Sequence, residues 1–318
     1  MIVDLDRFWH NRGHLAECAV FIRRGLDAGG QSVSVAVRCG ALNLAGQATG
    51  HHDAQAARSF FTESLRLARN THDDFRAARA LSGLAFVSHF TGDRDGVSVA
   101  GNAAVELART IGDPVLLGEC LVDFGATDSG PLTRAIYEEA LALTRRSGDR
   151  VNTAWSHNNL GNCALTEDDL GAAHQHLEQA RAIFQELGVL SPMLVCNLGW
   201  VDLRRGQIDA ANAAFTESLH RAEQYHFRRD ASYAILGLAC SAAAERQWER
   251  AACLLGFADQ ELQNCGASWP EPERTYRQQP LSDIDRQLGT DFDGCYDAGR
   301  AGDRSELIDF ALGQEHVP

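Results

Sequence analysis

Lysine is absent from this chain of 318 residues, and all 29 basic residues are arginine. A phosphate-binding loop of the Walker A type holds its phosphates with a lysine, so the sequence excludes that site. Catalysis through a lysine Schiff base is excluded for the same reason. Two common classes of enzyme, P-loop nucleotide hydrolases and lysine-dependent carbonyl enzymes, are therefore ruled out for this chain.

Other features are scarce as well. No stretch approaches the ~18 consecutive apolar residues of a membrane-spanning helix, and residues 1–6 are too charged for a targeting segment. Only residues 33–37 read as a short strand, and they read equally well as the start of a helix. The nine cysteines are odd in number and scattered without a Cys-X-X-Cys motif, which predicts buried thiols in a reducing, cytoplasmic compartment.

Motifs for catalysis or metal binding are missing too. The sequence has no Gly-X-Ser-X-Gly, no His-Glu-X-X-His and no glycine-rich phosphate loop. The three histidine groups that could suggest a metal lie in turns, at His51–His52 and at His72, or two positions apart at His174 and His176. Metal ligands on one helix need a spacing of three or four. We therefore expect no catalytic residues, no cofactor and no metal.

The balance of charge restricts the partners. The formal net charge is −14 at neutral pH, and an acidic surface repels phosphate backbones, so we expect no direct binding to nucleic acid. The apolar content of 45% is sufficient for a sizeable core.

A pattern that recurs every 36 to 40 residues is the most informative feature that is present. Each copy has an apolar residue next to a small one, then a turn, then an Ala-rich segment that ends in a second small residue. A fixed period in this range is typical of a solenoid of helical hairpins, which is normally a binding surface rather than a reaction centre. The closing small residues are Gly25, Ser64, Ala104, Ala140, Ala180, Ser218 and Ala258.

The other positions of the repeat keep the same register. A small residue before each turn lets two helices approach closely, and an aspartate at the turn can cap the next helix. The pairs before the turns begin at Leu44, Leu84, Cys120, Leu160, Leu198 and Leu238, and the turns include Asp53, Asp93, Asp128, Asp169, Gly206 and Arg246.

This series of positions resembles the tetratricopeptide repeat in a longer-period form. The resemblance implies an all-α fold, a right-handed α-solenoid of about seven helical hairpins. The repeat fades after Asp259, and Gly266, Pro270 and Pro272 indicate a linker. We therefore expect a repeat domain over residues 1–262 and C-terminal capping helices over residues 263–318. The alternative is an irregular helical bundle, which six aligned copies disfavour.

In stacks of this kind the first helix of each hairpin lines a concave groove, and the residues beside the apolar–small pairs are predicted to face it. An asparagine amide offers a donor and an acceptor to an extended peptide, and tryptophan supplies a large apolar anchor. In the alternative, structural reading, the asparagines satisfy neighbouring helix ends and the tryptophan fills the core. The predicted groove residues are Asn43, Phe86, Asn158, Asn159, Asn162, Asn197 and Trp200.

The two ends of the chain resemble a more specific family. Residues 8–17 read FWHNRGHLAE, and residues 251–256 and 298–301 read AACLLG and AGRA. These segments are similar to the sensor region of actinobacterial transcriptional regulators of the LuxR and maltose-regulator-like type, which are STAND-type ATPases. The resemblance implies a non-catalytic module that binds a peptide, a partner protein or a small effector.

Members of that family carry an upstream ATPase domain and often a downstream helix-turn-helix. We expect neither on this chain, because residue 1 falls inside the first helix of the first repeat, so an ATPase or DNA-binding regulator chain becomes the expected partner. The alternative is a stand-alone scaffold unrelated to transcription.

An apolar stripe at Ile2, Leu5, Phe8 and Trp9 follows helical spacing. We expect it to favour self-association or docking to another chain, because no upstream helix covers it. The alternative is that the stripe packs on the helix predicted over residues 15–26.

Overall fold

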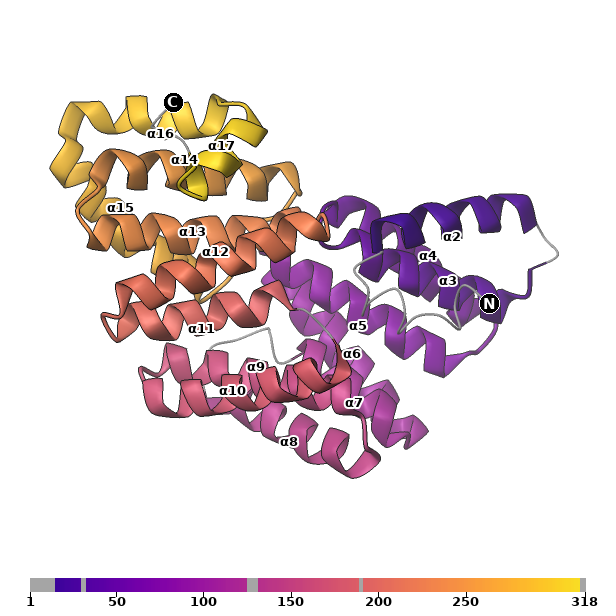
Figure 1. Ribbon diagram of the computed structural model, residues 1–318. Helices are drawn as coiled ribbons and strands as arrows, with labels where there is room; N and C mark the ends of the chain where they lie inside the picture. Colours follow the sequence, from indigo (N-terminus) through magenta and orange to yellow (C-terminus); the bar gives the residue numbers. More distant parts are fainter. Residues whose placement is uncertain (1–14, 30–32, 125–130, 189–190, 315–318) are drawn as a thin grey trace.

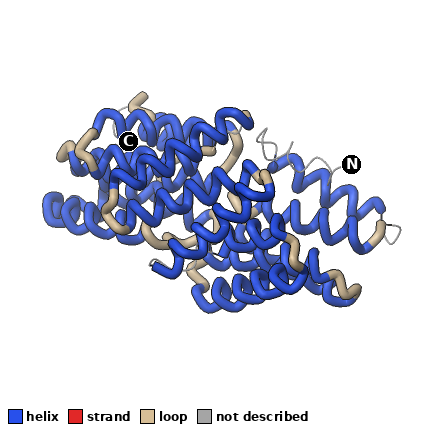
Figure 2. Tube along the Cα trace, turned by 90° about the horizontal axis from the view of Figure 1, so that it is seen from below, coloured by secondary structure: helices blue, strands red, loops and turns tan. Residues whose placement is uncertain are grey.

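The computed structural model of the protein describes residues 15–29, 33–124, 131–188 and 191–314. Within these ranges every regular element is a helix and no strand occurs (Figure 2). The all-α solenoid of helical hairpins is thereby confirmed, and the short strand candidate leads into a helix that begins at Val35. The predicted stripe from Ile2 to Trp9 and the turn at Asp128 lie outside the described residues.

The helices alternate between two positions in the solenoid, and consecutive hairpins follow one another along it (Figure 1). An additional helix, α2 (Leu15–Gly29), packs on the first of them. The first helices of the hairpins are α3 (Val35–Thr49), α5 (Asp74–Phe90), α7 (Pro114–Phe124), α9 (Arg150–Thr166), α11 (Pro192–Arg204) and α13 (Arg228–Ala244). The second helices are α4 (Ala54–Asn70), α6 (Arg94–Ile111), α8 (Pro131–Ser147), α10 (Leu170–Leu187), α12 (Ile208–Gln224) and α14 (Trp248–Asn264).

Aspartates cap the N-termini of several second helices, at the turns that the sequence predicts. Asp53, Asp93 and Asp169 each accept a hydrogen bond of 2.9 Å from the backbone N–H three residues further on. Each oxygen satisfies one of the N–H groups that the first turn of a helix leaves unpaired. The turns at Gly206 and Arg246 instead place those residues at positive φ, and the helices that follow have no side-chain cap.

Glycines in the first helices let large side chains of the second helices reach the backbone. A Cβ on Gly199 would lie 2.8 Å from the ring of Phe215, and one on Gly237 would lie 2.4 Å from the same ring. Phe215 of α12 is fully buried, so it fills the space between α11 and α13. Phe61 of α4 lies in the same way against glycines of α3 and α5. This close approach explains the small residue that recurs in the repeat.

Three helices follow the last hairpin: α15 (Glu273–Leu288), α16 (Phe292–Ala301) and α17 (Arg304–Ala311), with the short 3-10 turn η4 (Gly289–Asp291) before α16. The backbones of α16 and α14 almost touch, because a Cβ on Gly299 would lie 1.8 Å from the Cys253 carbonyl oxygen. Leu307 and Phe310 of α17 are buried in the same core as α14. These helices cover the last hairpin. Helix α14 itself runs to Asn264, and the division between residues 262 and 263 stays a prediction.

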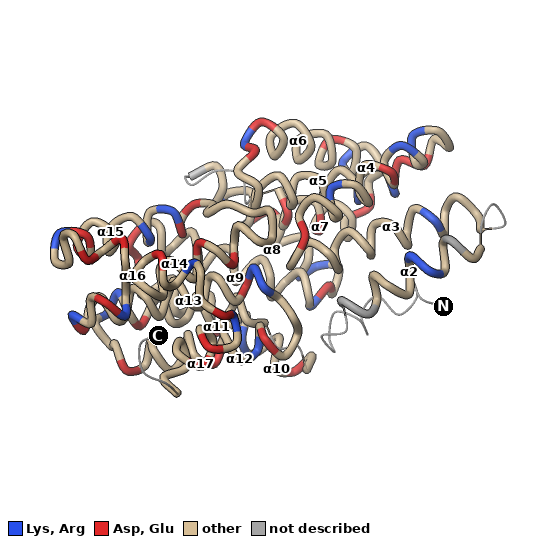
Figure 3. Tube along the Cα trace, turned by 90° about the horizontal axis from the view of Figure 1, so that it is seen from above, with Lys and Arg blue, Asp and Glu red and all other residues tan. Residues whose placement is uncertain are grey.

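Acidic and basic residues are interspersed along the helices (Figure 3). Several pairs connect consecutive hairpins, such as Arg109 with Glu139 at 3.0 Å and Arg134 with Glu167 at 2.6 Å. Among the described helices none is long and apolar enough to cross a membrane. The described residues likewise contain no group of three His, Cys, Asp or Glu arranged to hold a metal ion.

Candidate functional site

The solenoid curls until its first hairpins touch its last. We call this junction the clasp. On one side it consists of residues 50–54 and 90–92, in the turns after α3 and α5. On the other side it consists of residues 227–230, at the start of α13, and residues 265–268, after α14. Such a contact between distant repeats is unusual for a solenoid, in which each repeat normally contacts only its neighbours. Backbone N–H groups donate across the clasp from Arg229 to His51 (3.0 Å), from Ala54 to Cys265 (3.0 Å) and from Ser268 to Phe90 (2.8 Å).

Arg229 is the central side chain of the clasp and is only 3% exposed. Its guanidinium carbon lies 3.7 Å from the centroid of the Phe90 ring, and it donates to the Gly50 carbonyl oxygen at 3.1 Å. Asp230 accepts from Arg229 at 3.2 Å and lies 3.5 Å from His51. Burial raises the pKa of Asp230, but the charges of His51 and Arg229 outweigh it, so its pKa is lowered. A buried pair of this kind is costly to break by removing one partner.

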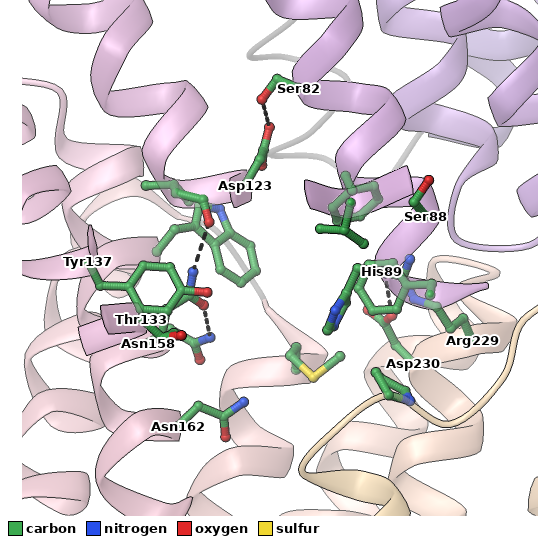
Figure 4. Close-up of a pocket in the computed structure, with 18 of the residues that line it drawn as sticks. Ser82, Ser88, His89, Asp123, Thr133, Tyr137, Asn158, Asn162, Arg229 and Asp230 are labelled. Carbon is green, nitrogen blue, oxygen red and sulfur yellow. Dashed lines mark hydrogen bonds and ion pairs between the residues drawn. The ribbon is translucent and has the colours of Figure 1, made fainter. Parts of the chain in front are cut away.

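The concave face inside the curled solenoid forms a cavity of about 640 Å³ (Figure 4). Its lining comes from helices α3 to α9, from the starts of α11 and α13, and from the loop before α15. Pockets for small molecules have volumes of roughly 300–1,000 Å³, so this cavity has the size of a ligand site. Its aromatic lining consists of Phe61, Phe86, Phe90, Tyr137, Trp155, Phe227 and Tyr233.

A ladder of amide hydrogen bonds connects the first helices of three consecutive hairpins. Asn159 of α9 donates to the Val122 carbonyl oxygen of α7 at 3.4 Å. Asn158 donates to Oδ1 of Asn159 at 3.2 Å, and Asn197 of α11 donates to Oδ1 of Asn158 at 3.0 Å. A buried amide without a partner destabilises a protein by roughly 1–3 kcal/mol. The ladder therefore helps to fix the stacking of α7, α9 and α11.

Carboxylates outnumber arginines in the cavity lining. Two of these carboxylates, Asp123 and Glu273, form no ion pair within the described part of the chain. Asp123 of α7 accepts a hydrogen bond of 2.6 Å from Oγ of Ser82 and is partly exposed in the cavity. Glu273 is the first residue of α15 and is 5% exposed. The other acidic lining residues are Glu119, Glu167, Asp230 and Glu271, which pair with arginines, and Asp149, which caps α9.

These two carboxyl groups and a neighbouring phenol are in unfavourable surroundings. Burial raises the pKa of Asp123 to about 7, and burial also raises the pKa of Glu273 to about 7. The Tyr233 hydroxyl is buried without a hydrogen-bond partner, and burial together with the charge of Glu273 raises its pKa well above the usual value. Groups kept in a cavity at the expense of stability are more typical of a functional site than of a structural one.

The hairpins behind this cavity carry a recognisable sequence pattern. Residues 126–186 match the family model of the tetratricopeptide repeat. The match covers α8, α9 and most of α10, and it includes Asn158 and Asn159. The tetratricopeptide-like character predicted from the sequence is thereby supported for the central region. No curated protein matches the chain in sequence.

Four of the predicted groove residues line the cavity of the solenoid: Phe86, Asn158, Asn159 and Asn162. Asn158 and Asn162 are drawn in Figure 4 on the same wall as Tyr137. Phe86 lies on the side of the clasp, because its ring centroid is 5.3 Å from the Arg229 guanidinium carbon. Binding of a ligand by these residues stays a prediction.

The other three predicted residues, Asn43, Asn197 and Trp200, are buried beside the cavity and do not line it. The amide of Asn197 belongs to the ladder, and Trp200 packs on Tyr276 and Phe215 with ring centroids 4.6 and 5.3 Å apart. Oδ1 of Asn43 has no hydrogen-bond partner among the described residues. The contacts of Asn197 and Trp200 are those of the structural alternative, and their part in binding is untested.

The sequence pattern does not single out the clasp or the unpaired carboxylates. Arg229 and Asp230 read as ordinary charged residues at a helix start, because their partner His51 is 178 positions away. A signal was available for Asp123, which directly follows the apolar residues 120–122 at the end of a first helix. A carboxylate that follows a buried run on the concave side of a repeat is a candidate for a perturbed group.

Proposed function

We propose that this chain is a non-catalytic sensor module whose cavity holds a small effector or a short peptide and whose hairpins contact a partner protein. The observation that carries the proposal is the clasp, because it turns the concave groove of a tetratricopeptide-like solenoid into a cavity. A volume of about 640 Å³ accommodates a small ligand but not a folded partner domain. A partner protein would therefore contact the outer faces of the hairpins.

We further propose that the module acts with transcriptional regulators of the LuxR type in the cytoplasm. This step rests on the resemblance of residues 8–17, 251–256 and 298–301 to the sensor region of that family. Gly256 and Gly299 of the two tail segments lie at the crossing of α14 and α16, where neither tolerates a Cβ, so these segments have a definite packing role in the fold. An ATPase or DNA-binding regulator chain is the partner that this origin implies.

The second candidate function is a scaffold unrelated to transcription. Val99 of α6 and Leu132 of α8 are 73% and 72% exposed, and apolar side chains on an outer face favour contact with another protein. A scaffold needs no ligand in its cavity. Blocking the cavity should therefore abolish the function of a sensor but not that of a scaffold.

A blocked cavity tests the sensor function. Asn162 lines the cavity, and its side chain makes no hydrogen bond among the described residues, so Asn162→Trp fills the space without breaking a side-chain hydrogen bond. Gln175→Trp on the exposed face of α10 is the matched control. Amines, carboxylates, sugars and short peptides are screened by thermal shift, and each stabilising compound is titrated by calorimetry into wild type and both variants.

We expect Asn162→Trp to keep the helical circular dichroism spectrum and to lose binding of these compounds, whereas Gln175→Trp keeps it. Equal binding by wild type and Asn162→Trp contradicts a role for the cavity. A screen in which no compound stabilises the wild type favours the scaffold.

A further inference from the structure

Within the described structure, the cavity lining contains two carboxylates without an ion-pair partner and one hydroxyl without a hydrogen-bond partner. Asp123 and Glu273 are carboxylates without an ion-pair partner in the described part of the chain, and Glu273 is more than nine-tenths buried. The Tyr233 hydroxyl is fully buried with no hydrogen-bond partner, although Tyr233 also lines the cavity. Buried groups of this kind are normally satisfied. Two carboxylates without a counter-ion in the described lining of one cavity point to a ligand that supplies a positive charge and hydrogen-bond donors.

The arginines of the lining do not offer an equivalent site for an anion. Arg79 pairs with Glu119 at 3.2 Å, and Arg274 lies 3.8 Å from Glu271. Arg229 is held in the clasp by Asp230 and by the ring of Phe90. Nε of Arg229 has no partner, but the charge of its guanidinium is already neutralised by Asp230. Arg94 also belongs to the lining but is exposed to solvent.

The rings around the cavity favour the same class of ligand. Aromatic faces attract cations, with an interaction of about 0.5–2 kcal/mol that is strongest when water is excluded. The clasp already contains this interaction, because Arg229 lies over Phe90 and, at 5.3 Å, over Phe86. Tyr137, Trp155 and the other aromatic side chains of the lining offer apolar contact for the body of a ligand.

We propose that the cavity recognises an organic cation, a primary amine or guanidinium group on an apolar body, with the carboxylates of Asp123 and Glu273 as its counter-ions. This inference rests on the proposed sensor function, since it names the chemistry of the ligand for the same cavity. The cation belongs either to a free amine or to an arginine or amino terminus of a short peptide, which share this chemistry.

A dependence on pH follows, because only an ionised carboxylate attracts a cation. Since the pKa values of both free carboxyl groups are about 7, affinity decreases as the pH falls from 8 to 6, and binding at pH 7 releases protons. A neutral ligand shows neither effect.

Other polar and titratable groups surround the two carboxyl groups. Those facing Asp123 are Ser82 and Arg79 of α5, Glu119 of α7 and Tyr137 of α8. Those near Glu273 are Glu271, Tyr233, Tyr276 and Cys196.

The test uses matched probes that differ only in charge. Tryptamine, its neutral alcohol tryptophol and the anion indole-3-propionate represent free small molecules. A blocked tetrapeptide with one arginine and the same peptide with citrulline represent the peptide source. Each probe is titrated by calorimetry into the full chain at pH 8 and pH 6, and at pH 7 in two buffers of different ionisation enthalpy to count released protons.

The variants are Asp123→Asn, Glu273→Gln and the double variant, with Asp297→Asn on the exposed face of α16 as control. We expect the amine or the arginine peptide to bind at least ~10-fold more tightly than its neutral counterpart at pH 8. Each single variant reduces that preference, the double variant removes it, and the control keeps it. Circular dichroism confirms that the variants are folded.

The inference is overturned if a neutral or anionic probe binds as tightly as the cation, if the double variant keeps the preference, or if neither cation binds. The two proposals fail in distinguishable ways. Neutral or anionic compounds that bind the wild type but not Asn162→Trp leave the sensor function in place and reject the cation. If no compound of the screen and no probe binds, both are rejected.

Discussion

Asp123 is a residue whose charge its surroundings disfavour. The carboxyl group titrates near 4 in an unfolded chain, whereas burial raises its pKa to about 7 in the folded protein. The folded state therefore binds the proton more tightly. The stability that the protonated Asp123 contributes is fully present below pH 4 and is lost as the pH rises towards 7. The loss is at most about 1.4 kcal/mol per pH unit.

We accordingly expect Asp123→Asn to stabilise the protein. The amide oxygen still accepts the hydrogen bond from Ser82, while the unfavourable charge is gone. The melting temperature should rise by ~2–6 °C at pH 8 and by much less at pH 5. Differential scanning fluorimetry at both pH values measures this, with Asp297→Asn expected to show no such difference. A melting temperature at pH 8 that is unchanged or lower would show that the ionised carboxylate is stabilising.

His157 of α9 is a residue with the opposite dependence on pH. Arg145 can only donate and lies 2.9 Å from Nε2 of His157, so that nitrogen accepts. The proton is then on Nδ1, which donates to Nδ1 of His176 at 2.9 Å. Burial and the charge of Arg145 lower the pKa of His157 to about 4. The neutral ring thus connects α8, α9 and α10.

The unfolded chain binds the proton of this histidine more tightly than the folded protein does. The stability that the neutral His157 contributes is therefore fully present above about pH 6.5 and is lost as the pH falls towards 4. We expect His157→Gln to be less stable than wild type at pH 7.5, because the hydrogen bond to His176 is missing, but to lose less stability between pH 6.5 and 5. Urea unfolding across this range gives both quantities. Parallel pH profiles for the two proteins would disprove the assignment.

At the scale of the element, the glycine of α16 that faces α14 decides how the capping helices attach. A Cβ on Gly299 would lie 1.8 Å from the Cys253 carbonyl oxygen, whereas a Cβ on Gly294 meets nothing within 4 Å. Gly299→Ala should lower stability by about 1–3 kcal/mol through overpacking. Gly294→Ala in the same helix should raise it by up to about 1 kcal/mol, because alanine favours helix. Guanidinium unfolding measures both; equal effects would mean that α16 is not packed as described.

The ladder offers a second test at this scale. Asn197→Ala removes the donor to Asn158 and leaves a buried oxygen unpaired, so a loss of roughly 1–3 kcal/mol is expected. Asn162→Ala removes no side-chain hydrogen bond and should change stability little. Thermal melts of the two variants separate a structural asparagine from one that is free for a ligand. A stable Asn197→Ala protein would return that residue to the candidate binding surface.

The hairpins are predictable from the sequence because their determinants are local. A small residue before a turn and an aspartate cap lie within one repeat, and Asp53, Asp93 and Asp169 take the predicted capping positions. The lining of the cavity is predictable only in part. Position beside the apolar–small pair predicts Phe86 and Asn162, both of which line the cavity, but it does not show that Asn197 is turned towards Asn158.

At the scale of the whole molecule, closure depends on curvature that accumulates over all the hairpins, so no local pattern reveals it. Arg229 and its acceptor Gly50 are 179 positions apart. The surroundings of Asp123 are more local, since Ser82, Arg79 and Glu119 belong to the neighbouring helices α5 and α7. Arg229 and Asp230 are missed by sequence reasoning because the clasp creates their environment.

Arg229→Ala should open the clasp. It removes the hydrogen bond to Gly50, the cation over Phe90 and the partner of the buried Asp230, and losses of about 3–5 kcal/mol are typical for such a pair. We expect faster amide hydrogen exchange at residues 50–54 and 265–268 and a larger radius of gyration by small-angle scattering. Arg221→Ala, which breaks only a surface pair with Glu217, is the control. Unchanged exchange at both segments would mean that Arg229 does not hold the clasp.

Closure also restricts how such a protein can change in length during evolution. An open array of repeats gains or loses a unit with little consequence, because each unit needs only its neighbours. Here one duplicated or deleted hairpin would carry the turn after α3 away from the start of α13, and residues 51 and 229 would no longer meet. The number of hairpins between these two points is thus a geometric condition of the fold, much as strand number is for a closed barrel.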